Sequence, residues 1–201
     1  ARPGDVISLA PDAVILATGS TMAWPGMLPE AWRHEGLVPD LRTLMPDLLR
    51  LQAPQGGTAV LFDMDHTEAT YAATQVLSRL FDRVVLLTPR DRIAEDTPLV
   101  TRLGILRRLS HLGVEVWPLN EPSPGSELES GLVLSRNVYT GQEREVPDVV
   151  LLTYSTPRIA DDGLAAPLEQ AGLNVHRVGD CYAPRGLMAA TAEGHAAGHE
   201  V

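Results

Sequence analysis

The sequence predicts an α/β protein built around a mainly parallel sheet. Residues 58–62 are a predicted strand, and residues 84–87 are a short, fully apolar strand of the kind that parallel sheets bury on both faces. Between these strands, apolar residues recur with the spacing of one helical face, at Ala69, Ala72, Ala73, Val76, Leu77 and Leu80. Strand, helix and strand in this order open a nucleotide-binding unit, so the sequence predicts a three-layer, Rossmann-like NAD(P)-binding-type domain.

The segments that follow continue this alternation. In chain order, we expect a helix over 98–112, a strand over 114–117, a polar loop over 118–130, a hairpin over 131–146 and a strand over 148–153. Gly113 is a suitable C-terminal cap for the helix, and Thr140-Gly141 is a suitable turn for the hairpin. The hairpin is expected to form a small antiparallel flap beside the parallel sheet.

The turn after the first of these strands lacks the glycines of a dinucleotide site. Glycine is used there because a Cβ would block the phosphates, and the next helix then stabilises their charge with its N-terminus. This chain has Asp63, Asp65 and Glu68 at the turn. Three carboxylates would repel a pyrophosphate, so we expect the turn to reject NADH. They are also suited to capping the following helix, and the two roles are compatible.

Composition limits the class of protein. The chain has 201 residues, 44% of them hydrophobic and 21% charged, which is ordinary for a globular protein of one large or two small domains. A net charge of −10, with no basic cluster, argues against a nucleic-acid partner. No apolar run approaches the ~20 residues of a membrane span, and the first residues lack a signal-peptide core. With one cysteine, Cys181, the expected location is the cytoplasm.

A second motif combines the two ends of the chain. Residues 12–19 are an apolar strand that ends in a glycine turn, and residues 174–180 are a short strand that ends in Gly179-Asp180. A helix is expected over 187–197. Backbone N–H groups at such a turn can bind an anion, and the Asp180 carboxylate can accept hydrogen bonds from ribose or ribityl hydroxyls. The alternative is that Asp180 merely caps the helix.

These segments together resemble one enzyme group. The matching stretches are DAVILATGS (12–20), TAVLFDMDHTEAT (58–70), VVLLTPRDRIAEDTP (84–98), RRLSHLGVEV (107–116) and HRVGDCYAPRGLMAATAEGHAAG (176–198). They resemble the C-terminal half of the NADH:flavin oxidoreductases. This group includes trimethylamine dehydrogenase, the related methylamine and histamine dehydrogenases, the demethylases of dimethylglycine and N-methylproline, and 2,4-dienoyl-CoA reductase. In that group a TIM barrel with FMN and a 4Fe–4S cluster precedes tandem FAD-like and NAD-like domains. The amine branch has an Asp-rich turn like this one and passes electrons to an electron-transferring flavoprotein.

The resemblance implies a domain plan. Residues 1–20 and 157–201 are expected to be an incomplete FAD-like domain, residues 21–53 a connector, and residues 54–156 the NAD-like domain. Thr18, Gly19, Gly179 and Asp180 are implied to form its residual ADP- or FAD-like site. The chain is then expected to be an inactive C-terminal fragment, without a catalytic residue or cofactor of its own.

In the full-length protein, the resemblance implies FMN, a 4Fe–4S cluster, ADP or FAD, a methylated amine as substrate, and an oligomer. The expected partners are the N-terminal barrel of the same polypeptide and an electron-transferring flavoprotein. Two alternatives stay open: a non-catalytic docking or assembly domain without a ligand, and an NAD(P)H-using flavin oxidoreductase similar to dienoyl-CoA reductase. Metal binding at His195 and His199, or at Asp63, Asp65 and His66, is weakly indicated, because neither set has a ligand spacing typical of a metal site.

Overall fold

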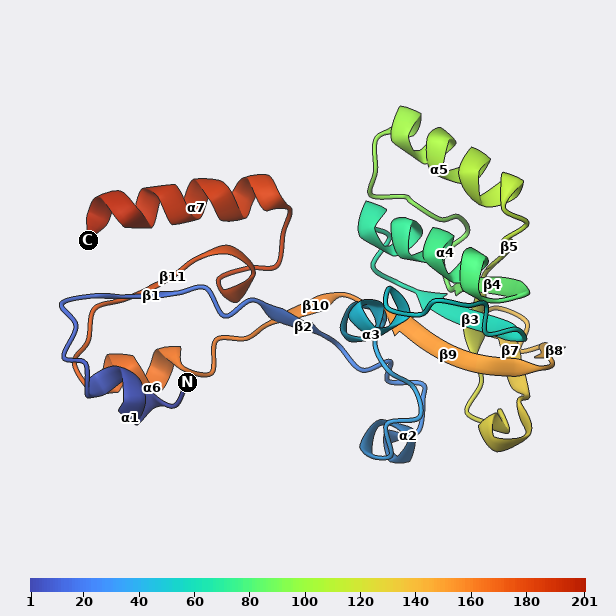
Figure 1. Ribbon diagram of the computed structural model, residues 1–201, viewed down its shortest axis with the longest axis horizontal. Helices are drawn as coiled ribbons and strands as arrows, with labels where there is room; N and C mark the ends of the chain where they lie inside the picture. The colour runs from blue at the N-terminus through green and yellow to red at the C-terminus, as the bar shows by residue number, and fades with distance from the viewer. The chain divides into compact units, whose positions relative to one another are not determined.

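The chain divides into two compact units, one inserted into the other. The computed structural model describes residues 1–201. The split unit consists of Ala1–Ala23 and Arg158–Val201, and the inserted unit of Trp24–Pro157. Each unit has its own sheets and its own core (Figure 1). No helix is both long enough and apolar enough to cross a membrane.

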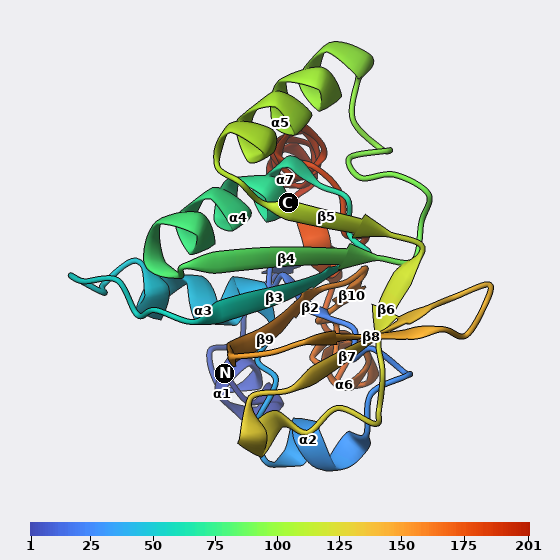
Figure 2. The same ribbon diagram turned by 90° about the vertical axis from the view of Figure 1, so that its right-hand side faces the viewer.

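A four-stranded parallel sheet forms the centre of the inserted unit. Its strands are β3 (Thr58–Asp63), β4 (Arg83–Thr88), β5 (Glu115–Pro118) and β9 (Val149–Ser155), in the spatial order β5-β4-β3-β9 (Figure 2). All neighbouring pairs are parallel. The predicted α/β fold with a parallel sheet is confirmed, and each predicted strand of this sheet is present.

Helices cover one face of this sheet. They are α3 (Leu41–Leu48), α4 (Glu68–Leu80) and α5 (Leu99–His111). Their buried side chains share one cluster with the residues of β3 and β4 that face them, and this core includes Leu41, Leu48, Ala59, Leu61, Tyr71, Leu77, Val84, Leu86, Ile105 and Leu109. A short helix, α2 (Glu30–His34), precedes α3 and has no buried residue.

A three-stranded antiparallel sheet completes the inserted unit. It consists of β6 (Asn120–Pro122), β7 (Val133–Asn137) and β8 (Glu143–Val146), and β7 and β8 form the predicted hairpin. The segment 118–130, expected to be a polar loop, contains β6 and the short 3-10 helix η1 (Leu128–Ser130). Asparagine and proline are depleted in strands, so composition concealed β6, which is held by its pairing with β7.

The split unit contains two short strand pairs. β1 (Val14–Leu16) pairs in parallel with β11 (Val175–Arg177), and β2 (Ser20–Met22) pairs antiparallel with β10 (Arg158–Ala160). As expected, β1 and β3 lie in different sheets.

Three helices and one turn pack around these strands. They are α1 (Pro3–Ile7), α6 (Ala165–Gln170), α7 (Leu187–Glu200) and the 3-10 turn η2 (Gly179–Cys181). Figure 1 shows α7 on the side of the β1–β11 pair opposite α1 and α6. The small core of this unit consists of Leu16, Ala165, Leu168 and Cys181.

Candidate functional site

The parallel pairing of β1 with β11 brings the two motifs of the split unit together. Both strands end at the same edge, so the loop after β1 meets the turn η2. The Thr18 hydroxyl lies 3.1 Å from the Cys181 sulfur and donates to the carbonyl oxygen of Asp161. Gly19 has a φ of +85°, in the left-handed region that glycine adopts without strain. The residues predicted to form one site are therefore neighbours.

Asp180 is held by several groups of the split unit itself. Its Oδ2 accepts hydrogen bonds from the Ser20 hydroxyl at 2.9 Å and from the Arg158 guanidinium, and its Oδ1 accepts the Arg185 N–H at 3.1 Å. The side chain is only 16% exposed. A carboxylate in this position joins β2, β10 and the segment that leads into α7. A ribose hydroxyl would have to compete with these donors.

The neighbouring backbone N–H is also engaged. Gly179 donates its N–H to the Glu193 carboxylate of α7 at 2.7 Å, and Glu193 forms an ion pair with Arg185. The alternative interpretation, in which Asp180 caps the last helix, is wrong. Gly186 is the N-cap residue of α7, and no side chain forms a cap hydrogen bond there.

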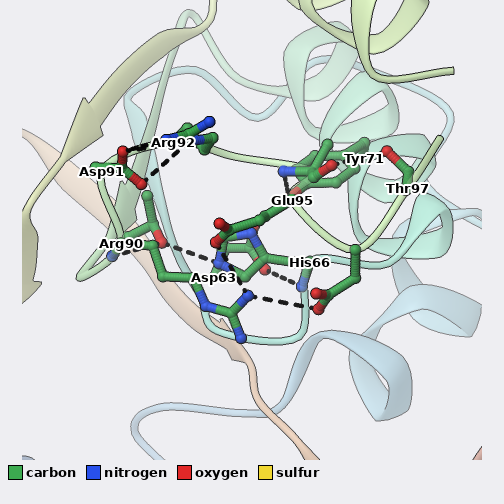
Figure 3. Close-up of polar contacts among 11 residues, drawn as sticks. Asp63, His66, Tyr71, Arg90, Asp91, Arg92, Glu95 and Thr97 are labelled. Atoms are coloured by element: carbon green, nitrogen blue, oxygen red, sulfur yellow. Dashed lines mark hydrogen bonds and ion pairs between the residues drawn. The ribbon is translucent and has the colours of Figure 1, made fainter. Parts of the chain in front are cut away.

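The Asp-rich turn of the inserted unit has a different geometry. Asp63 is the last residue of β3, and its side chain is completely buried. Its Oδ1 accepts the His66 N–H at 3.0 Å, and its Oδ2 accepts the Tyr71 hydroxyl at 2.7 Å (Figure 3). The same Tyr71 oxygen accepts the Ala94 N–H at 2.6 Å. Burial raises the pKa of Asp63, and the nearby His66 and these hydrogen bonds oppose that rise.

His66 lies within this cluster in an unusual backbone conformation. Its φ is +55°, which is uncommon for a residue with a Cβ. The ring is buried, with Nε2 at 3.2 Å from the Thr88 hydroxyl and with no partner for Nδ1. Burial lowers the pKa of His66, and the field of Asp63 opposes this effect.

The other two acids of the turn are more exposed than Asp63. Asp65 accepts the Thr67 hydroxyl at 2.5 Å, and Glu68 is an exposed residue in the first turn of α4. The N-cap residue, Thr67, makes no side-chain cap bond, and neither Asp63 nor Asp65 accepts a backbone N–H from the first turn of α4. Capping of α4 by those two carboxylates was therefore a wrong expectation, while Glu68 is placed favourably for the helix dipole.

The sequence weakly indicates two sets of metal ligands, His195 with His199, and Asp63 with Asp65 and His66. His195 and His199 lie on α7 with ring centroids 4.5 Å apart in an edge-to-face contact. In residues 1–201, no group of three or more His, Cys, Asp or Glu side chains is placed to hold a metal ion.

Sequence reasoning missed Tyr71, which connects the Asp63 turn to the loop before α5. The predicted apolar face of α4 included Ala69 and Ala72, which are exposed, whereas Thr70, Tyr71 and Thr74 are buried. The signal that could have revealed the correct face is the helical spacing of Thr70, Thr74 and Leu77. It was obscured because two of these residues are polar.

Comparison with known proteins identifies solved structures with a similar fold. No family model matches the chain, and no curated protein matches its sequence. Among solved structures, it resembles histamine dehydrogenase from Rhizobium sp. 4-9, at 22% identity and a TM-score of 0.77 over 100% of this chain and 32% of that one. The shared property is the fold.

Two other solved structures have the same arrangement. 6-Hydroxypseudooxynicotine amine oxidase from Pseudomonas geniculata N1 has 21% identity and a TM-score of 0.80 over 98% of this chain and 30% of its own. 2-Naphthoyl-CoA reductase has 18% identity and a TM-score of 0.79 over 100% of this chain and 28% of its own. The chain thus spans about a third of the length of these proteins.

Proposed function

We propose that this chain is the C-terminal, non-catalytic portion of a flavin- and iron–sulfur-dependent oxidoreductase that acts on methylated amines. The observation that carries the proposal is the turn after β3. Asp63 fills it, buried and hydrogen-bonded to Tyr71 and His66, at the position where an NADH-binding domain has glycines. A Rossmann-like unit without such a site is suited to an enzyme that receives electrons from an amine and passes them to another protein.

The proposed redox groups belong outside residues 1–201. A 4Fe–4S cluster needs four thiolates, and this chain has only Cys181, which is buried in the core of the split unit. The residues present therefore do not fit the cluster. We assign the inserted unit a scaffolding role in electron transfer and no chemical step of its own.

The experiment is flavin reduction in the full-length protein under anaerobic conditions. Trimethylamine, dimethylglycine and N-methylproline are each added, and NADH is added to a parallel sample. We expect an amine to bleach the flavin absorbance and NADH to leave it unchanged. Bleaching by NADH instead would favour the reductase alternative, and calorimetry would then show whether the 201-residue chain itself binds the nucleotide. Micromolar binding of NADH at the Asp63 turn would contradict the proposal.

We further propose that Thr18, Gly19, Gly179 and Asp180 border an ADP- or FAD-type site in the full-length protein. Binding there requires Asp180 to exchange one of its internal partners for a ribose hydroxyl. A thermal-shift series with ADP, AMP, FAD and NADH measures this exchange, since a ligand that binds only the native state raises its stability. Stabilisation by ADP or FAD that Asp180→Ala abolishes would support the site.

A non-catalytic assembly domain is the second candidate. It is favoured by the internal partners of Asp180 and Gly179, which satisfy the site from within the chain. A flat response to all four nucleotides, in a chain whose full-length form is not reduced by an amine, would favour it.

A further inference from the structure

Helix α5 carries apolar side chains on two faces. Ile105 and Leu109 are buried in the core of the inserted unit. Leu99, Leu103 and Leu106 follow one another at the i, i+4 and i+7 positions, so they form one stripe along the helix. A helix with two apolar faces normally buries both of them. In α5 only the face with Ile105 and Leu109 is buried.

The leucine stripe is open to solvent. Leu99, Leu103 and Leu106 are between 40% and 58% exposed, and the adjacent Val100 is 83% exposed. The helix lies at the outer edge of the helical layer, beside α4 (Figure 2). Contiguous exposed apolar side chains of this kind mark contact surfaces.

The charge of α5 is opposite to that of the chain. The helix contains Arg102, Arg107 and Arg108 and no acidic residue, in a chain with a net charge of −10. None of these three arginines takes part in an ion pair within residues 1–201. At the helical spacing of 100° per residue, Arg102 and Arg107 border the leucine stripe on its two sides, whereas Arg108 lies on the far side of the helix. Guanidinium groups that flank apolar side chains are suited to bidentate contact with carboxylates.

We propose that the exposed face of α5 is a docking surface for an acidic amphipathic helix of a partner protein. Leucines at i, i+4 and i+7 are the spacing with which one helix packs against another, and charge complementarity fixes the sign of the partner. A second copy of this chain is disfavoured because the arginines would face each other. A membrane surface is disfavoured because the face has no aromatic anchor.

The test is binding of a synthetic helix to the 201-residue chain. One peptide of about 18 residues, above the length at which a helix is marginally stable in water, has leucines at helical spacing flanked by glutamates. A second peptide has lysines in place of the glutamates. We expect the glutamate peptide to bind with a Kd near 10⁻⁴ M, about the strength of a small contact, and the lysine peptide to bind at least about tenfold more weakly.

Charge reversal gives a matched test of the surface. Arg102→Glu with Arg107→Glu should weaken binding of the glutamate peptide about tenfold and improve binding of the lysine peptide. Arg79→Glu, at an exposed arginine of α4, is the charge control. Leu103→Asp, which places a charge in the leucine stripe, should also weaken binding of the glutamate peptide, and Leu49→Asp, at an exposed leucine outside α5, is its control. Circular dichroism verifies that each variant is folded.

Four outcomes would overturn this proposal. They are no binding of the glutamate peptide at about 1 mM, binding that is insensitive to the Arg102 and Arg107 reversal, self-association of the chain that Leu103→Asp abolishes, and binding to phosphatidylserine vesicles without binding to the peptide. None of these outcomes depends on the flavin or amine chemistry. Failure of the docking surface therefore leaves the proposed function standing, and the reverse also holds.

Discussion

The Tyr71 hydroxyl donates a hydrogen bond to the Asp63 carboxylate at 2.7 Å, and both side chains are completely buried. Because the same hydroxyl accepts the Ala94 N–H, this one oxygen links the end of β3, helix α4 and the loop before α5. The acidic turn is therefore a structural junction.

Replacement of Tyr71 by phenylalanine tests that junction. The change removes a donor to a buried carboxylate and leaves the Ala94 N–H without a partner, so we expect a loss of about 2–3 kcal/mol in the free energy of unfolding. Urea denaturation measures the loss. Tyr139→Phe, at an exposed tyrosine of the inserted unit, is the control and should cost less than about 0.5 kcal/mol. Equal effects of the two changes would contradict the assignment.

The pH dependence of stability should carry the signature of His66. Burial lowers its pKa in the folded state, so below a pH of about 6.5 the unfolded chain binds a proton that the folded chain does not. The contribution of His66 to stability is therefore present above pH 6.5 and is lost as the pH falls towards the folded pKa.

We expect His66→Asn to remove part of this slope. Asparagine tolerates the positive φ and does not titrate. Chemical denaturation between pH 7 and pH 5 should show a wild-type slope that is steeper by up to about 1.4 kcal/mol per pH unit. Identical slopes in the two proteins would show that His66 protonates with equal ease in both states.

Asp180 offers a test in the split unit. Asp180→Asn weakens the contacts to Arg158, Ser20 and the Arg185 N–H, and leaves a largely buried guanidinium without its carboxylate. We expect a loss of about 1–3 kcal/mol. The control Asp162→Asn removes the more exposed pair with Arg177 and should cost less than about 1 kcal/mol. Hydrogen exchange of β1 and β11 measures both, and equal protection in the two variants would argue against a central role for Asp180.

Two glycines with the same backbone conformation should differ in their tolerance of alanine. Gly57 has a φ of +68°, and a Cβ there would lie 2.8 Å from a methyl carbon of Val150 and 3.1 Å from the carbonyl oxygen of Asp148. Gly141 has a φ of +69° and open space around it. Gly141→Ala should cost about 1 kcal/mol from backbone strain, and Gly57→Ala should cost about 1–3 kcal/mol more from overpacking. Thermal unfolding compares the two variants.

Much of the inserted unit could be predicted because its strands are continuous apolar runs. Residues 59–62 and 84–87 have no polar side chain, and such runs fit the centre of a parallel sheet. The face of α4 could not be predicted by the same rule, because Thr70 forms a buried hydrogen bond with Ser155 across 85 residues of sequence. A polar side chain with a distant partner leaves no trace in local periodicity.

The acidic turn shows the same limit in the site. The sequence suggested three similar carboxylates around one phosphate position, but Asp63 is buried whereas Glu68 is exposed. This difference depends on Tyr71, whose ring reaches the turn only once α4 has packed on the sheet. The nucleotide role of Thr18, Gly19, Gly179 and Asp180 stays a prediction.

The insertion of one unit into the other determines an order of assembly. The inserted unit is a continuous stretch of chain, and its two ends are joined by an edge-to-face contact between Trp24 and Tyr154, with centroids 5.4 Å apart. Thr18 and Cys181 of the split unit are 163 residues apart in sequence. Once the inserted unit has folded, its two ends lie close together, so the two segments of the split unit can meet at a small further cost in chain entropy. During synthesis, residues 1–23 therefore leave the ribosome before the inserted unit but pair with residues 158–177 only after it.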